Sequence, residues 1–206
     1  QKLGIEIVRR PTGGRALLHN HEVTYSFTAP IPHNKFPPSL LGAYKTVAKA
    51  LLEGLKEVGV YGAVLASGKK TTIGKHSFHS PSCLSSINHL EIEVQGAKLV
   101  GSAQRRTKKA FLQHGSILLD CDRGLVNSLF KFETDDARCR SMEILNHKVV
   151  TLSECLGKSM TRKEVFKALI KGFSHTLKGN WVLGHLNSFE LIKCTSNSYS
   201  KENINI

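Results

Sequence analysis

Residues 90–106, LEIEVQGAKLVGSAQRR, form the stretch that decides the expected fold. Two runs of β-forming residues, Leu90–Val94 and Lys98–Gln104, lie on either side of the short segment Gln95-Gly96-Ala97. Two such runs around a glycine-containing turn are typical of a β-hairpin. We expect another strand at Phe111–Leu119, so the centre of the chain predicts neighbouring antiparallel strands.

The first thirty residues extend this predicted sheet. Ile5–Arg10, Ala16–His19 and Glu22–Ala29 are rich in β-forming residues or alternate them with polar ones. Thr12-Gly13-Gly14 lies between the first two runs and is typical of a turn. The sequence therefore predicts strand, turn and strand ahead of the first helix.

Two helices are predicted from their end signals. Ser39 is the expected N-cap of a helix whose apolar residues repeat at helical spacing until Gly59 ends it. Thr161 and Glu164 predict a capping box that opens a helix over Thr161–Leu177. Most of the second half of the chain has helical spacing, so strands dominate the first half and helices the second.

The remaining segments set the expected domain organisation. Tyr61–Ala66 predicts a short strand, and Ser67–Ser82 predicts a loop, because it is rich in Gly, Lys, Ser and His. Residues 1–180 are expected to form one domain, followed by a weakly patterned tail at 181–206 that frays. Residue 1 leads directly into a strand pattern without a starting Met, so we expect the chain to lack its beginning.

Composition and charge narrow the functional classes. The chain has 206 residues, of which 40% are hydrophobic and 22% charged, which excludes collagen-like, mucin-like and wholly disordered proteins. The net charge is +13, with 16 basic and 7 acidic residues in 1–120 against 13 and 9 in 121–206. We expect an acidic partner but no nucleic acid, because few aromatic residues accompany the basic ones. We expect no membrane partner and a cytoplasmic location, since no apolar run or signal-peptide pattern is present.

The cysteines are spread too widely for a disulfide framework or a paired zinc motif, so we expect reduced thiols and no metal. His76, His79 and Cys83 are spaced so that they would supply three zinc ligands, and this alternative stays open. The five cysteines are Cys83, Cys121, Cys139, Cys155 and Cys194.

The first candidate site is the glycine turn in residues 9–16, RRPTGGRA. Gly13 and Gly14 let backbone N–H groups approach a ligand without a Cβ in the way, and Arg10 and Arg15 offer forked donors for phosphate or carboxylate. The alternative is a solvent-exposed basic turn. A Walker loop is excluded because no Lys-Ser or Lys-Thr pair follows the glycines.

The second candidate site combines a lysine with a cysteine. Lys98 is followed by three small residues at 101–103, which would leave room for a ligand beside an ammonium that orients a carbonyl. Cys83 lies on the other side of the predicted hairpin; if the two side chains meet, the ammonium lowers the thiol pKa and makes a nucleophile. The alternatives are a solvated lysine and an inert buried cysteine. His114, at the edge of the next strand, is either a site residue or a structural histidine.

Three blocks in this order resemble the biotin/lipoate protein ligase superfamily: RRPTGGRALLH at 9–19, KLVGSAQ at 98–104 and QHGSILLD at 113–120. The first block and LEIEVQGAKLVGSAQRR are especially similar to octanoyl-carrier-protein:protein octanoyltransferases of the branch related to lipoate ligases. The resemblance spans about residues 1–178 and implies an α/β (α+β) domain with a mixed, largely antiparallel sheet flanked by helices. It also implies that the glycine block at 9–19 and the lysine block at 98–104 line a tunnel for a lipoyl or octanoyl chain. Binding roles are thereby implied for Arg10, Thr12, Gly13, Gly14, Arg15, His19, Gly101, Ser102, Ala103, His114 and Gly115.

The resemblance implies octanoyl transfer by a ping-pong mechanism with no cofactor. Cys83 matches the cysteine of the transferases, which implies a catalytic pair with Lys98. The thiolate would attack an octanoyl thioester on acyl carrier protein, and a lysine of a lipoyl-domain protein would then take the acyl group. Such acceptors include the glycine-cleavage H protein and the acyltransferase subunits of 2-oxoacid dehydrogenases. These partners are acidic as families, which would account for the basic excess.

The chain departs from the family pattern in three places. His19-Asn20 replaces the usual His-Asp, and Arg15 stands where the ligases more often have a glycine, which favours the transferase branch. Relatives also have an N-terminal helix and strands upstream of the glycine turn that contribute to the central sheet. The alternatives are therefore an ATP-dependent lipoate-protein ligase, which would need ATP and Mg, and an inactive fragment or basic binding module.

Overall fold

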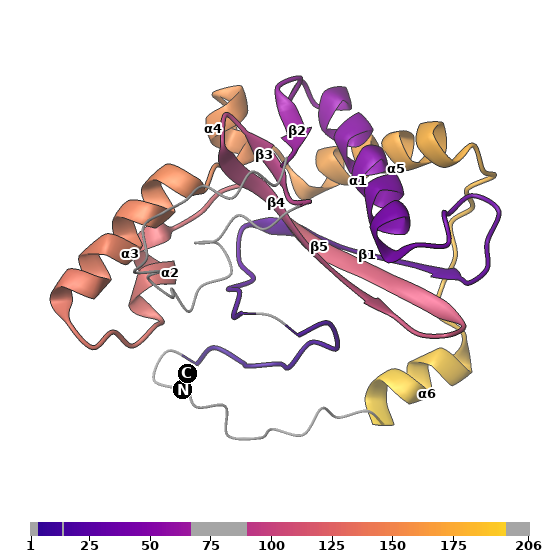
Figure 1. Ribbon diagram of the computed structural model, residues 1–206, viewed down its shortest axis with the longest axis horizontal. Helices are drawn as coiled ribbons and strands as arrows, with labels where there is room; N and C mark the ends of the chain where they lie inside the picture. Colours follow the sequence, from indigo (N-terminus) through magenta and orange to yellow (C-terminus); the bar gives the residue numbers. More distant parts are fainter. Residues whose placement is uncertain (1–3, 14, 67–89, 197–206) are drawn as a thin grey trace.

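The structure is a computed structural model that describes residues 4–13, 15–66 and 90–196, the last four of these by their backbone alone. Five strands and six helices lie in these ranges (Figure 1). The strands are β1 (Glu22–Pro30), β2 (Ala63–Leu65), β3 (Ile92–Val94), β4 (Ala97–Arg106) and β5 (Ala110–Leu118). The helices are α1 (Leu40–Glu57), α2 (Arg123–Ser128), α3 (Asp135–Lys148), α4 (Leu152–Leu156), α5 (Arg162–Leu177) and α6 (Ser188–Ser196).

The strands form one antiparallel sheet in the order β1-β5-β4-β3-β2. The predicted hairpin is confirmed as β3 and β4, which are joined by Gln95 and Gly96, both with positive φ. Consecutive left-handed residues match the right-handed twist of the strands that they connect. The predicted strand after the hairpin is confirmed as β5, which lies between β4 and β1.

A β-bulge in β4 determines which way Lys98 faces. Ile92 of β3 opposes Val100, whereas the next residue, Glu93, opposes Lys98, so Leu99 is an extra residue without an opposite partner. One extra residue reverses the alternation of faces along a strand. Lys98 therefore shares a face with Gly101 instead of lying on the opposite one.

Helices α1 and α5 pack against each other and cover one face of the sheet (Figure 1). Gly172 of α5 lies so close to α1 that a Cβ there would be 2.3 Å from the Gly54 nitrogen. The main core lies in this layer and includes Val47 and Leu51 of α1 and Phe173 of α5. Burying these side chains stabilises the layer, at roughly 25 cal/mol per Å² of apolar surface removed from water.

The opposite face of the sheet is covered only in part. A second cluster of buried apolar residues, with Leu118 at the end of β5, packs against α2 and α3. Leu17 and Leu18, from the segment ahead of β1, join this cluster. The middle of the face carries polar side chains instead, and the candidate site lies there.

The predicted helix ends are confirmed at both helices. The Ser39 side chain accepts a hydrogen bond from the Gly42 nitrogen at 3.0 Å, and α1 ends just before Gly59, which has φ of +99°. Thr161 and Glu164 form both halves of the capping box at α5. Each cap is formed by residues that lie within a few positions of one another in the sequence. A sequence pattern can therefore predict these helix ends without knowledge of the tertiary structure.

The strands expected at the start of the chain are not formed. Ile5–Arg10 and Ala16–His19 are not strands, although their residues favour one. A strand needs a partner for its backbone groups, and among the described residues β1 is an edge strand with only β5 beside it. The tail contains α6, a helix that the weak pattern of 181–206 did not predict.

Within the described ranges, no helix is long and apolar enough to cross a membrane.

Candidate functional site

The candidate site lies on the sheet face opposite α1 and α5, across β1, β5 and β4. The strand register places Thr24 of β1 opposite Ser116 of β5, and Ser116 opposite Gly101 of β4. Residues that oppose each other in antiparallel strands point to the same face. His114 and Ala103 form the next opposed pair on this face, so the second and third predicted blocks meet here.

Lys98 and Glu91 form a buried ion pair at one end of this face. The Lys98 Nζ lies 2.5 Å from Glu91 Oε1, and the two side chains are 1% and 4% exposed. A charged pair is buried only where the partners compensate each other's lost hydration. A Cβ on Gly101 would lie 2.9 Å from Lys98 Cε, so the absence of a side chain at Gly101 leaves the path of the lysine open.

The glycine turn is docked on this face by contacts with β5 and β4. The Thr12 Oγ1 and His114 Nε2 lie 2.6 Å apart, and the Arg105 guanidinium donates to the Pro11 carbonyl at 3.1 Å. Gly13 has φ of +67°, a conformation that favours glycine, and its nitrogen donates to the Arg10 carbonyl. The first predicted block thus meets the third, although more than ninety residues separate them.

Burial lowers the pKa of His114, and the positive charge of Arg10, together with that of His19 when its ring is protonated, lowers this pKa further. The imidazole is therefore neutral at neutral pH, and one ring nitrogen is an acceptor. A neutral histidine against Thr12 can orient the turn or accept a hydrogen bond from a ligand. Arg10 also donates from Nη2 to the carbonyl oxygen of Arg15, which closes the turn on itself.

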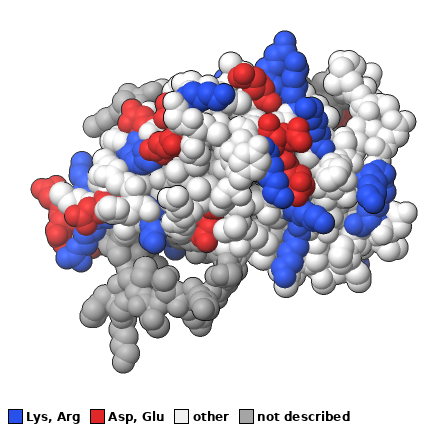
Figure 2. All heavy atoms as spheres, turned by 90° about the horizontal axis from the view of Figure 1, so that it is seen from above, with Lys and Arg blue, Asp and Glu red and all other residues white. Residues whose placement is uncertain are grey.

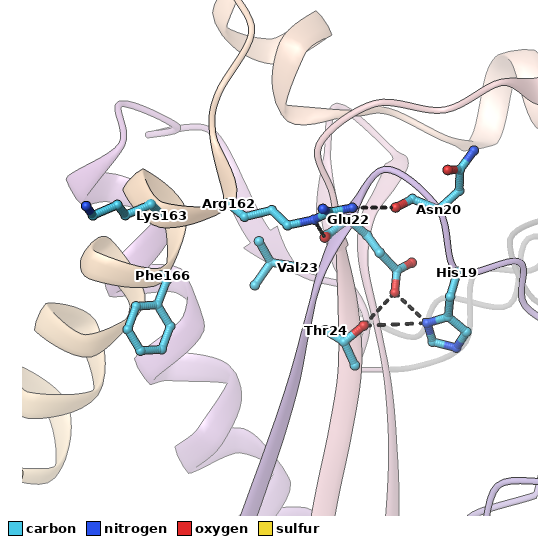
Figure 3. Close-up of a pocket in the computed structure, with 8 residues that line it drawn as sticks. All are labelled: His19, Asn20, Glu22, Val23, Thr24, Arg162, Lys163 and Phe166. Carbon is cyan, nitrogen blue, oxygen red and sulfur yellow. Dashed lines mark hydrogen bonds and ion pairs between the residues drawn. The ribbon is translucent and has the colours of Figure 1, made fainter. Parts of the chain in front are cut away.

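Glu22, the first residue of β1, gathers three hydrogen bonds on one carboxylate oxygen. Its Oε1 accepts from Thr24 Oγ1 at 2.7 Å and lies 2.5 Å from His19 Nδ1 (Figure 3). The same oxygen accepts from Ser116 Oγ at 2.8 Å. The other oxygen, Oε2, is buried and has no hydrogen-bond partner in the described part of the chain. Glu22 is not among the residues that the sequence predicted for the site. The signal that could have identified it is the alternation of polar residues at 22, 24, 26 and 28, which indicates a polar face of the strand.

A surface hollow of about 630 Å³ opens beside Glu22, between the start of β1 and the start of α5. Arg162 of α5 donates to the carbonyl oxygens of Asn20, at 2.9 Å, and of Glu22, at 3.1 Å (Figure 3). These two bonds hold the segment that carries His19 against α5. The lining residues are His19, Asn20, Glu22, Val23, Thr24, Arg162, Lys163 and Phe166.

Two predicted binding residues face the α1 layer instead. The Ser102 Oγ lies 2.6 Å from the Tyr25 hydroxyl, and burial raises the pKa of that tyrosine despite hydrogen bonds with Ser102 and Gln113. A Cβ on Gly115 would lie 2.2 Å from the Gly101 carbonyl oxygen and 2.9 Å from the Tyr25 ring. These two positions therefore shape the packing of β4 and β5, on the side of the sheet away from Lys98.

Several predicted positions lie outside the described residues: Gly14, Cys83, and the possible zinc ligands His76 and His79. The pairing of Cys83 with Lys98 therefore stays a prediction. Arg15 is exposed, and its backbone carbonyl is its contact with the turn.

The described cysteines Cys121, Cys139 and Cys155 are free thiols, and burial raises the pKa of the first and last of them. Among the described residues, no group of three His, Cys, Asp or Glu side chains is placed to hold a metal ion.

Comparison with known proteins identifies relatives over most of the chain. Residues 1–174 match the model of the lipoyl protein ligase A/B catalytic domain. Octanoyltransferase LipM of Brevibacillus brevis is 37% identical over 181 residues, which cover 86% of this chain and 65% of the relative. Octanoyltransferase LipM of Bacillus subtilis is 35% identical over 195 residues, which cover 92% of this chain and 67% of the relative. The chain thus spans about two thirds of the length of these curated relatives.

Solved structures share the fold. A chain from the structure of a bipartite lipoate protein ligase and its E2 lipoyl domain from Thermoplasma acidophilum superimposes with a TM-score of 0.75 at 20% identity, covering 98% of this chain and 70% of that one. Lipoate-protein ligase A bound with ATP gives a TM-score of 0.70 at 21% identity, covering 95% and 68%.

The expected α/β fold with a largely antiparallel sheet is therefore confirmed, and so is the resemblance drawn from the three sequence blocks. The matched residues, 1–174, include the glycine turn, Lys98 and the polar face of the sheet. The chain belongs to the lipoyl protein ligase A/B catalytic domain family, and within it is similar to the octanoyltransferases named LipM.

Proposed function

We propose that this protein is an octanoyltransferase that moves an octanoyl group from acyl carrier protein to a lysine of a lipoyl-domain protein. The observation that carries the proposal is the buried Lys98 ammonium, which extends past Gly101 on the polar face where the glycine turn docks. The proposal is supported by 35–38% identity to several relatives named octanoyltransferase LipM.

Cys83 is the proposed nucleophile. Its thiolate attacks the carbonyl carbon of the octanoyl thioester; a bond from carbon to the cysteine sulfur forms, and the phosphopantetheine sulfur leaves and takes a proton. In the second half-reaction the lysine nitrogen attacks the acyl-enzyme, an amide forms, and the cysteine sulfur leaves. The reaction as proposed consumes a thioester and therefore needs no ATP, metal or cofactor.

Lys98 is the proposed second catalytic residue. An ammonium fixed by Glu91 on a water-poor face can donate to the carbonyl oxygen, where negative charge develops during both attacks. The glycine turn, Ala103 and His114 share the face and are the proposed lining for the acyl chain and its carbonyl.

The proposed partners are acyl carrier protein and acidic lipoyl-domain proteins such as the glycine-cleavage H protein or 2-oxoacid dehydrogenase acyltransferase subunits. The net charge of +13 supports this proposal, because opposite charge speeds encounter. On the face shown in Figure 2, basic side chains are interspersed with acidic ones, so the positive charge there is spread instead of forming one continuous patch. A cytoplasmic location remains part of the proposal.

The test is mass spectrometry after incubation with octanoyl-acyl carrier protein. The protein should gain one octanoyl group, and Cys83→Ser should abolish the gain. Cys139→Ser is the matched control, because Cys139 is exposed on α3 and away from the site, and this variant should be acylated normally. Absence of an adduct on the unaltered chain would refute the proposal. Labelling of a lipoyl domain that needs ATP and persists in Cys83→Ser would establish the ligase alternative instead.

A further inference from the structure

The proposed reaction requires a base that has not been assigned. A lysine side chain is an ammonium at neutral pH, since its pKa is about 10.4, and its nitrogen cannot attack an acyl group until a proton leaves. Lys98 is a proton donor paired with Glu91 and so cannot serve as this base while it remains charged. In the proposed function, on which this inference rests, another group must therefore receive the proton.

The His19 imidazole has the geometry of such a base. Its Nδ1 lies 2.5 Å from Glu22 Oε1, and since a carboxylate only accepts, Nδ1 carries the hydrogen of the neutral ring. The lone pair is then on Nε2, which Figure 3 shows turned away from Glu22. The His19 side chain is 57% exposed, whereas that of Glu22 is 4% exposed. A proton acceptor thus faces outward while its supporting carboxylate is buried.

Glu22 is built to hold a protonated histidine in place. Thr24 and Ser116 fix the orientation of Oε1, and Arg162 fixes the backbone of Glu22 through its carbonyl. The buried Oε2 has no hydrogen-bond partner in the described part of the chain, so no cation among the described residues competes with an imidazolium for this carboxylate. A carboxylate that orients a histidine and stabilises its charged form is the device used by hydrolytic triads.

The pair also lies at the right place on the sheet. Ser116 donates a hydrogen bond to Glu22, and it opposes Gly101 on the neighbouring strand. The Lys98 side chain runs beside Gly101. Glu22 and Lys98 are therefore on strands two steps apart, about 10 Å at the usual strand spacing. The hollow lined by His19, Glu22 and Lys163 opens beside the pair, so His19 borders space at the surface that a side chain of another protein could enter.

We infer that His19, positioned by Glu22, is the general base that deprotonates the acceptor lysine in the second half-reaction. Nε2 takes one proton from the lysine ammonium, and the neutral nitrogen attacks the thioester carbonyl carbon. The carbon–nitrogen bond forms, the carbon–sulfur bond breaks, and the departing sulfur takes the second proton from nitrogen. The products are the amide, the enzyme thiol and an imidazolium, which returns its proton to water.

The test separates the two half-reactions. Purified octanoyl-enzyme is mixed with a lipoyl domain or with hydroxylamine, which is already neutral at pH 7.5, and loss of the acyl group is followed by mass spectrometry. In His19→Gln, transfer from the octanoyl-enzyme to the lipoyl domain should slow about 100-fold more than the reaction of the same octanoyl-enzyme with hydroxylamine does. His21→Gln is the matched control: this nearby histidine is exposed, and it should behave like the unaltered protein in both reactions.

A pH series distinguishes a base from a residue that only shapes the site. Free lysine amine increases tenfold per pH unit below its pKa, so the deficit of His19→Gln should shrink about tenfold per unit between pH 7 and 9. The other charged or titratable groups around His19 are Glu22, His114, Arg10, Arg162 and Lys163, and all of them are kept in the variant. A deficit that stays constant with pH, or an equal loss with hydroxylamine, would overturn the inference. Failure of the unaltered chain to form the acyl-enzyme would instead refute the proposed function.

Discussion

At the scale of single residues, the site depends on positions where a side chain is absent as much as on those where one is present. Gly101 leaves the space through which Lys98 reaches Glu91, and Gly13 supplies the left-handed turn that presents Thr12 to His114. A ligand-binding face built this way tolerates little added volume, because its groups are held by close packing.

Gly101→Ala should reduce octanoyl transfer while leaving the fold intact. Its Cβ would lie 2.9 Å from Lys98 Cε, which forces the lysine aside and moves its ammonium away from the reacting carbonyl. Misplacement by about 1 Å costs on the order of 10²-fold in rate. Single-turnover acylation measures the loss, and Gly62→Ala, which has no atom within 4 Å of the added carbon, is the control. Equal rates for the two variants would contradict the assigned role of Gly101.

His114 should make the protein less stable in mild acid. Its folded pKa is lowered, chiefly by burial, so below about pH 6.5 the unfolded chain binds a proton that the folded chain resists. The stability that His114 contributes is therefore complete above the pKa that it has in the unfolded chain. This contribution falls as the pH drops from there toward the lower pKa that His114 has in the folded protein. Urea unfolding at pH 7.5 and 5.5 should show a larger loss for the unaltered protein than for His114→Gln. An equal loss in both would show that His114 is not the group responsible.

At the scale of elements, the contact between α1 and α5 positions the sheet and the start of α5. Gly172 and Gly54 let the two helices approach more closely than side chains would permit. The capping box of Thr161 and Glu164 begins α5 at the turn that carries Arg162, whose guanidinium holds the backbone of β1. Packing in one layer therefore determines the position of polar groups at the edge of the sheet.

Gly172→Ala should destabilise the protein by about 1–3 kcal/mol, as overpacking of a core usually does. The sign of this change in stability is informative. In a helix without a close neighbour, replacing an interior glycine by alanine stabilises the helix by roughly 0.5–1 kcal/mol, so destabilisation indicates close contact with α1. The added carbon would lie 2.3 Å from the Gly54 nitrogen and 2.5 Å from the Ala50 oxygen. Thermal unfolding measures the effect, with Gly184→Ala as a control that meets no atom within 4 Å. Stabilisation by Gly172→Ala would show that the helices are not in close contact.

At the scale of the whole molecule, the two faces of the sheet have separate tasks. The face covered by α1 and α5 contains the main core, including Val47, Leu51 and Phe173. The other face has a smaller apolar cluster at one end and leaves Glu22, Ser116 and the Lys98 region for polar contacts. One antiparallel sheet thereby stabilises the fold on one side and organises chemistry on the other.

Local signals account for the parts of the fold that were predicted correctly. The hairpin at 90–106, the N-cap at Ser39 and the capping box at Thr161 each depend on residues within a few positions of one another. Ile5–Arg10 was misassigned because a strand pattern says nothing about the presence of a neighbouring strand. No local sequence pattern predicts the bulge at Leu99, because the bulge depends on the register between the two strands β3 and β4.

The sequence by itself determined the family, through its three blocks, and determined the positive charge, the turns and the helix starts, because all of these are properties of adjacent residues. Only the tertiary structure decided that Lys98 faces Gly101 and that Glu22 joins His19 to Ser116. The physical reason is that a side chain's face depends on strand register, and one extra residue reverses it. The contacts that make the site therefore arise when distant strands pair.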